Sequence, residues 1–157
     1  MKHFKFWALL IAPMLILSAC KKSNNAPPAP VQGISFKVNG TLIKTDISIA
    51  RIYPTQMEMV IGGSYNRIQT IELDLYNYQP GTYVFGKDKV GMSYSLHNAY
   101  LTSIYLYNTV SGTITVTSLT ATSISGTFQY DAELQNQPTI HITEGEFNLP
   151  VTNAPTE

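Results

Sequence analysis

From Gly33 to Pro150 the chain alternates apolar and polar residues in short runs that end at glycine, asparagine or proline. Ile71, Leu73 and Leu75, for example, alternate with carboxylates, as expected of a strand with one buried and one wet face. No stretch keeps the 3.6-residue period of an amphipathic helix over three turns. The pattern predicts an all-β domain of about nine or ten strands, with a polar tail at residues 151–157.

Three local features refine this prediction. Asn39-Gly40 between two alternating runs is a strong signal for a β-hairpin. The apolar positions change parity after Gly145, which predicts a β-bulge there. Tyr100 to Tyr107 is apolar at nearly every position, which predicts a strand buried on both faces.

Short strands with frequent turns are typical of an antiparallel β-sandwich or a β-barrel. We favour the sandwich, because the glycine-centred breaks suit strands that change sheets. A curved barrel of the lipocalin kind is the alternative.

The N-terminus reads as a lipoprotein signal peptide covering residues 1–19. Lys2 and Lys5 precede an apolar run from Phe6 to Leu17, which is shorter than the ~20 residues of a membrane-spanning helix. Leu17-Ser18-Ala19-Cys20 then resembles a lipobox, in which the Cys20 thiol takes a diacylglyceryl group and its freed amine an acyl chain such as palmitate. A plain secretory signal or an uncleaved anchor is the alternative.

Residues 20–32 hold the lipidated cysteine and a tether rich in proline, which favours an extended chain. The all-β domain follows at residues 33–150. We expect a lipid-anchored protein of the bacterial cell envelope, at the outer membrane, that stands off the bilayer.

Composition excludes several classes of protein. Charged residues make up 13% of the chain, and removing residues 1–19 leaves 8 basic and 10 acidic residues without a basic cluster beyond the tether, so a nucleic-acid partner is not expected. Cys20 is the single cysteine, so the chain has no internal disulfide and no cysteine pair for zinc or redox chemistry. We expect no cofactor.

Several motifs resemble a family of small lipoproteins of unknown function from Bacteroidota-type bacteria. They are the lipobox, Phe36-Lys37-Val38-Asn39-Gly40, Pro80-Gly81-Thr82-Tyr83, Ser111-Gly112-Thr113-Ile114-Thr115, Ile124-Ser125-Gly126-Thr127-Phe128 and Thr143-Glu144-Gly145-Glu146-Phe147. The resemblance implies an envelope location and an all-β fold, and it carries no catalytic residues. The lysines at 21 and 22 depart from the acidic residues that often follow the cysteine in surface-exposed members, which leaves the facing leaflet open.

Candidate chemistry is sparse, and we assign no catalytic residue and no metal site. Carboxylates share a strand face at Glu72 and Asp74 and again at Asp131 and Glu133, a spacing that permits acid–base chemistry but that any wet strand face produces. The local group of His141, Glu144 and Glu146 is weak as a zinc site.

Tyrosine is the residue in excess, with ten in the chain. Tyr76, Tyr78 and Tyr83 flank the Pro80-Gly81 turn, and their rings and hydroxyls suit stacking on a glycan or a protein. Half-buried strand positions explain the same residues without any ligand.

The sequence leaves three alternative functions open. The first is a non-catalytic binding or accessory module for a glycan, a peptide or an envelope protein. The second is a small hydrolase that uses carboxylates such as Glu72 and Asp74. The third is a barrel that carries an apolar ligand in an interior lined by Phe128 and Tyr130.

Overall fold

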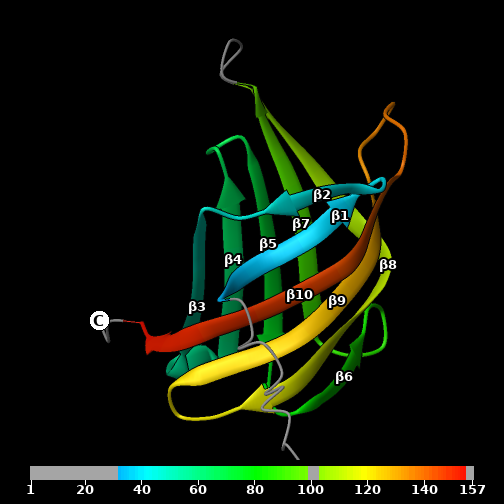
Figure 1. Cartoon of the computed structure of the whole chain (residues 1–157). Coiled ribbons are helices and arrows are strands. Elements are labelled where there is room, and N and C mark those ends of the chain that lie inside the picture. Colours follow the sequence, from blue (N-terminus) through cyan, green and yellow to red (C-terminus); the bar gives the residue numbers. More distant parts are fainter. Residues whose placement is uncertain (1–31, 99–102, 155–157) are drawn as a thin grey trace, which may run out of the picture.

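The computed structural model describes residues 32–98 and 103–154, which form one curved β-sheet of ten strands (Figure 1). The predicted all-β class and strand number are therefore confirmed. A short 3-10 helix at Pro54–Gln56 lies between two of the strands. The strands are β1 (Gly33–Val38), β2 (Thr41–Lys44), β3 (Ile47–Tyr53), β4 (Glu58–Tyr65), β5 (Gln69–Tyr76), β6 (Gly81–Val84), β7 (Val90–Asn98), β8 (Ser103–Leu119), β9 (Ser123–Glu133) and β10 (Ile140–Asn153).

The predicted signal peptide, Cys20 and the tether up to Val31 lie outside the described residues. Within the two described ranges, no helix has both the length and the apolar character needed to span a bilayer.

The sheet closes into a barrel of seven strands: β3, β4, β5, β7, β8, β9 and β10. Closure depends on a short parallel pairing in which Val151, Thr152 and Asn153 of β10 lie beside Ala50, Arg51 and Ile52 of β3. The other strand pairs of the described sheet are antiparallel. The lipocalin-like barrel given as the alternative is therefore the observed architecture.

The preferred sandwich is wrong because the glycine-centred breaks bend strands within one sheet and do not move them between two sheets. β8 and β10 are long, with 17 and 14 residues, and both carry bulges where the register shifts. Each bulge adds local twist and bends its strand. Figure 1 shows the result, with β9, β10 and β1 crossing in front of β3, β4 and β5.

Three glycines make room for aromatic rings on neighbouring strands. A Cβ on Gly126 would stand 2.4 Å from Phe147 Cζ, and one on Gly145 would stand 2.5 Å from the Phe128 ring. Gly112 faces Tyr130 in the same way, at 2.3 Å from its Cβ. Each glycine is paired with its aromatic residue across adjacent strands. A side chain at any of these three positions would therefore clash with the neighbouring strand.

The local predictions at Asn39-Gly40 and Gly145 are confirmed. Asn39 and Gly40 have φ of 47° and 85° and connect β1 to β2 as a two-residue hairpin loop. The register of β10 shifts between Ile142 and Gly145, with Glu144 at φ 50°, so the parity change is a bulge.

The barrel interior is filled by side chains from all seven strands and from β1. Phe128 lies near its centre, with ring centroids 6.1 Å from Phe36 and 6.4 Å from Phe147. The Tyr130 hydroxyl donates a hydrogen bond to the carbonyl oxygen of Ser93 at 2.8 Å. Burial raises the pKa of Tyr130 well above its ordinary value, so the hydroxyl stays protonated as a donor.

Two sequence expectations fail at the strand ends. The strand expected at Tyr100–Tyr107 begins outside the described residues, and its described part is not buried on both faces, because Ile104, Tyr105 and Leu106 have 61%, 37% and 46% of their surface exposed. These residues belong to the β7–β8 hairpin, which projects beyond the rest of the barrel in Figure 1. Residues 151–153 of the segment expected as a polar tail belong to β10, and they close the barrel.

Candidate functional site

Two adjoining hollows lie on the outer side of the sheet formed by β8, β9, β10, β1 and β2. The larger has a volume of about 550 Å³ and the smaller about 420 Å³. Thr127 and Glu146 line both, so the two hollows adjoin at these residues, and we call them together the outer groove. Its remaining lining residues are Gln32, Gly33, Ile34, Ser35, Lys44, Thr45, Thr113, Thr115, Thr117, Ser125, Gly126, Phe128, Gln129, Glu144, Gly145, Phe147 and Asn148.

A single row of paired residues crosses the outer groove perpendicular to the strands. It runs from Lys44 to Ser35, Glu146, Thr127, Thr115 and Thr82, each residue being the register partner of the next on adjacent strands. Side chains that are partners across a sheet point to the same face. The row therefore places a cation, an anion and four hydroxyl groups along one line.

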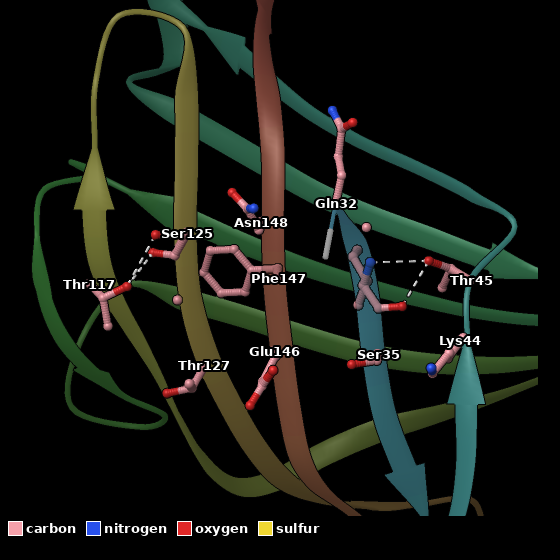
Figure 2. A pocket seen from close by; sticks show the side chains of 13 residues that line it. Gln32, Ser35, Lys44, Thr45, Thr117, Ser125, Thr127, Glu146, Phe147 and Asn148 are labelled. Atoms are coloured by element: carbon pink, nitrogen blue, oxygen red, sulfur yellow. Dashed lines mark hydrogen bonds between the residues drawn. The ribbon is translucent and has the colours of Figure 1, made fainter. Parts of the chain in front are cut away.

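The central members of this row are open to solvent and have no partner within the described protein. In the part of the chain that the structure describes, no hydrogen bond or ion pair engages the side chains of Lys44, Ser35, Glu146 and Thr127 (Figure 2). At the ends of the groove, by contrast, hydroxyls pair with one another: Thr82 with Thr115 at 3.0 Å, and Thr117 with Ser125 at 3.2 Å. The centre of the groove can therefore offer hydrogen bonds to a ligand without first breaking its own.

The floor and one edge of the groove are built from the fold itself. The Phe147 ring is 2% exposed and lies against Gly126, so the absence of a side chain at Gly126 is what lets the ring pack there. Gln32 and Gly33 line the larger hollow. The chain therefore enters the domain at the edge of the groove.

The histidine named as a metal candidate is not joined to its expected partners. His141 Nδ1 lies 2.6 Å from Asp131 Oδ1, while Glu144 forms an ion pair with Lys37 at 2.7 Å. The His141 and Ser111 hydrogen bonds lower the pKa of Asp131. No group of three or more potential metal-ligating side chains occurs among residues 32–98 and 103–154.

The carboxylates named for hydrolysis lie on the opposite side of the barrel. Asp74 sits over Gly91, where an added Cβ would stand 2.7 Å from Asp74 Oδ2. Burial and the nearby charges of Glu72 and Glu58 raise the pKa of Asp74 to about 6. These three residues do not line either hollow of the outer groove.

The three candidate tyrosines lie around the connection from β5 to β6 and have different environments: Tyr76 ends β5, Tyr78 follows it, and Tyr83 lies within β6. The Tyr83 hydroxyl accepts a hydrogen bond from Gln79 N at 2.6 Å and donates one to Gln79 O at 2.8 Å, so it fastens its own turn. Tyr78 and Tyr83 also pack against the core. Tyr76 hydrogen-bonds to Glu58, and this bond raises its pKa. Their role in ligand binding stays a prediction.

The residues named for an apolar cargo, Phe128 and Tyr130, are 3% exposed and packed against other rings. The two hollows of the outer groove lie on the outside of the sheet, where Ser35, Thr127 and Glu146 alternate with buried residues. The structure thus gives no support to a carried apolar ligand.

The sequence did not identify the outer groove, although it contains the relevant polar positions. Thr113, Thr115 and Thr117 form a strict alternation in the sequence, but so do many exposed strand faces. Glu146 and Lys44 become neighbours in one row only through pairings between β2, β1 and β10. Predicting the groove would have required the register of these three strands, which the sequence pattern does not give.

Comparison with known proteins identifies a family for this chain but assigns no activity to it. No curated protein and no solved structure is significantly similar to the chain. The model of one family, described as a domain of unknown function (DUF6252), matches residues 31–149, which cover β1 to β9 and most of β10. The chain therefore belongs to the DUF6252 family.

Proposed function

We propose that the protein is a lipid-anchored lipoprotein of a bacterial envelope, at the outer membrane, and that its barrel is a non-catalytic binding or accessory module. The outer groove is its binding surface. Its partners are membrane lipid, through Cys20, and a glycan or another envelope protein. Nucleic acid is not among them, because the groove's one unpaired cation, Lys44, is matched by Glu146 among the described residues.

The observation that carries the binding proposal is the row of solvent-open polar side chains without protein partners at the centre of the groove. Exposed polar side chains on a wet strand face are common, but here they line a depression and leave Ser35, Glu146 and Thr127 without protein partners in the described chain. A binding site is usually concave with a few polar groups that fix the orientation of the ligand. The filled interior leaves the outer surface to make such contacts.

The proposed anchor would hold this surface near a membrane. Lys21 to Gln32 would span roughly 37 Å as an extended polyproline chain, and Gln32 lies at the edge of the groove. Cys20 with two or more acyl chains would hold the protein stably, since each buried CH₂ contributes about 0.8 kcal/mol. The groove would then meet envelope components that lie close to the bilayer.

Crosslinked recovery from the native envelope tests this proposal. Tagged wild-type protein is compared with a groove variant, Ser35→Ala plus Glu146→Gln, and with Glu72→Gln, a matched carboxylate change on the opposite face. We expect one reproducible partner with wild type and Glu72→Gln, and its loss from the groove variant. Equal recovery from all three proteins would contradict the groove as the binding surface.

The hydrolase is a second candidate, favoured by the pKa of Asp74 near 6. A carboxyl group in this range can exchange a proton at the pH of many acid–base reactions. A screen of glycoside and ester substrates at pH 5–7, run with wild type and Asp74→Asn, tests it. Hydrolysis that disappears in Asp74→Asn supports the enzyme, and equal activity in both removes Asp74 from the mechanism.

A further inference from the structure

We infer that the outer groove binds a neutral carbohydrate chain, which lies across the strands along the row from Lys44 to Thr115. The inference rests on the proposed binding function and names the class of ligand. Its basis is the combination of unpaired hydroxyl, carboxylate and ammonium groups with the shape of the depression.

The chemistry of the row matches sugar hydroxyls. Ser35 and Thr127 each offer a hydroxyl that donates and accepts, Glu146 offers two acceptor oxygens, and Lys44 offers donors. Sugar hydroxyls also both donate and accept, so each can pair with any of these groups. Threonine methyl groups between the hydroxyls supply small apolar contacts for the C–H groups on the face of a sugar ring.

An extended peptide fits the groove less well. Peptides that bind a sheet by strand addition need a free backbone edge. In the groove β9 is paired with β8 and β10, and β1 is paired with β10 and β2, so neither offers such an edge. Among the strands that line the groove, β2 keeps a free outer edge. A peptide added there would run beside β2, parallel to the strands, and would not lie across the row.

Anionic and apolar ligands fit less well too. Phosphate or carboxylate recognition uses converging cations, whereas Lys44 is balanced by Glu146 and the other acidic residue, Glu144, is already paired with Lys37. An apolar chain would bury the unpaired hydroxyls and the carboxylate of Glu146 without hydrogen bonds, which is costly. A neutral ligand rich in hydroxyl groups avoids both penalties.

The length of the row indicates a chain of several sugar units. From Lys44 on β2 to Thr115 on β8 the row crosses four gaps between neighbouring strands. At about 4.8 Å for each gap this part of the row is roughly 19 Å long. Thr82 and Thr115 close one end by bonding to each other.

Titration calorimetry on the full-length lipidated protein in detergent tests the inference. The probes are a panel of neutral oligosaccharides of one to six units, a matched anionic set and an extended peptide. Variants are Thr127→Val, which keeps the shape and removes the hydroxyl, and Glu146→Ala; Thr70→Val on the outer face of β5 is the control. Thermal melting confirms that each variant is folded.

We expect affinity for neutral oligosaccharides to rise with chain length. Thr127→Val should weaken binding about 2- to 10-fold and Glu146→Ala about 10- to 100-fold, with no change in Thr70→Val. If the protein binds no carbohydrate but the groove variant still loses an envelope protein in the crosslinking experiment, the carbohydrate inference is overturned. The proposed binding function then still holds. If every groove variant keeps its binding to both the carbohydrate and the envelope protein, the carbohydrate inference and the groove as binding surface are both overturned.

Discussion

The Phe147 ring occupies the space that a side chain at Gly126 would fill. A Cβ at Gly126 would stand 2.4 Å from Phe147 Cζ and 2.1 Å from the carbonyl oxygen of Thr115. Both residues line the outer groove, and both lie on strands that close the barrel. The contact therefore links barrel closure to the floor of the proposed binding surface.

Gly126→Ala should destabilise the protein by about 2–3 kcal/mol, because neither the ring nor the backbone of β8 can move away without distorting the barrel. Gly62→Ala is the matched control, since its new Cβ would meet its nearest neighbour at an ordinary 3.6 Å. Chemical denaturation of the two variants measures the difference. Equal free energies of unfolding would show that the Gly126–Phe147 contact tolerates a methyl group.

Tyr83→Phe should lower the free energy of unfolding by about 1 kcal/mol, because it removes the hydroxyl that bonds to both backbone groups of Gln79. Tyr78→Phe is the control, since no hydrogen bond of its hydroxyl occurs among the described residues. Ligand affinity should not change in Tyr83→Phe. Weaker binding with unchanged stability would instead favour a direct role of this tyrosine in recognition.

Asp74 should make stability depend on pH between its ordinary pKa of 3.8 and its folded value of about 6. The folded state holds this proton more tightly than the unfolded state, so the free energy of unfolding falls as the pH rises through that window. Relative to Asp74→Asn, wild type should lose about 1 kcal/mol from pH 4 to pH 7, a value reduced for the solvent screening of a partly exposed group.

Urea denaturation at several pH values gives this difference directly. Glu72→Gln should reduce the pH dependence of the Asp74 contribution without abolishing it, because the Glu72 charge is a smaller cause of the shift than burial. Parallel stability curves for wild type and Asp74→Asn would mean that Asp74 titrates at its ordinary pKa.

Cys20→Ser should release the protein from the membrane fraction, because it removes the thiol that we propose takes the lipid. Incorporation of labelled palmitate should be lost at the same time. A second substitution, Ser23→Ala in the tether, serves as control for altered processing. Membrane retention of Cys20→Ser would indicate an uncleaved anchor or another attachment.

The sequence predicted the local structure of the barrel well. Asn39-Gly40 and the parity change at Gly145 were sufficient for a hairpin and a bulge, because backbone conformation at these sites is set by a few neighbouring residues. Alternation also identified most interior positions, such as Leu73 and Ile114.

Closure and the groove could not be predicted in this way. The pairing of Val151 with Ala50 joins residues a hundred positions apart, and no short pattern encodes it. Ile104 looked buried by its composition, but it lies on a projecting hairpin and is 61% exposed. The groove needs the register of Ser35, Glu146 and Thr127 on three strands, which alternation within single strands leaves undetermined.

The most direct test of the groove as the binding surface is photocrosslinking in intact cells. A photoreactive amino acid replaces Thr127 in the full-length protein, and the same amino acid replaces Thr70 on the far side of the barrel as control. We predict a discrete crosslinked product from position 127 that position 70 does not give. Identical products from the two positions, or none from position 127, would contradict the account.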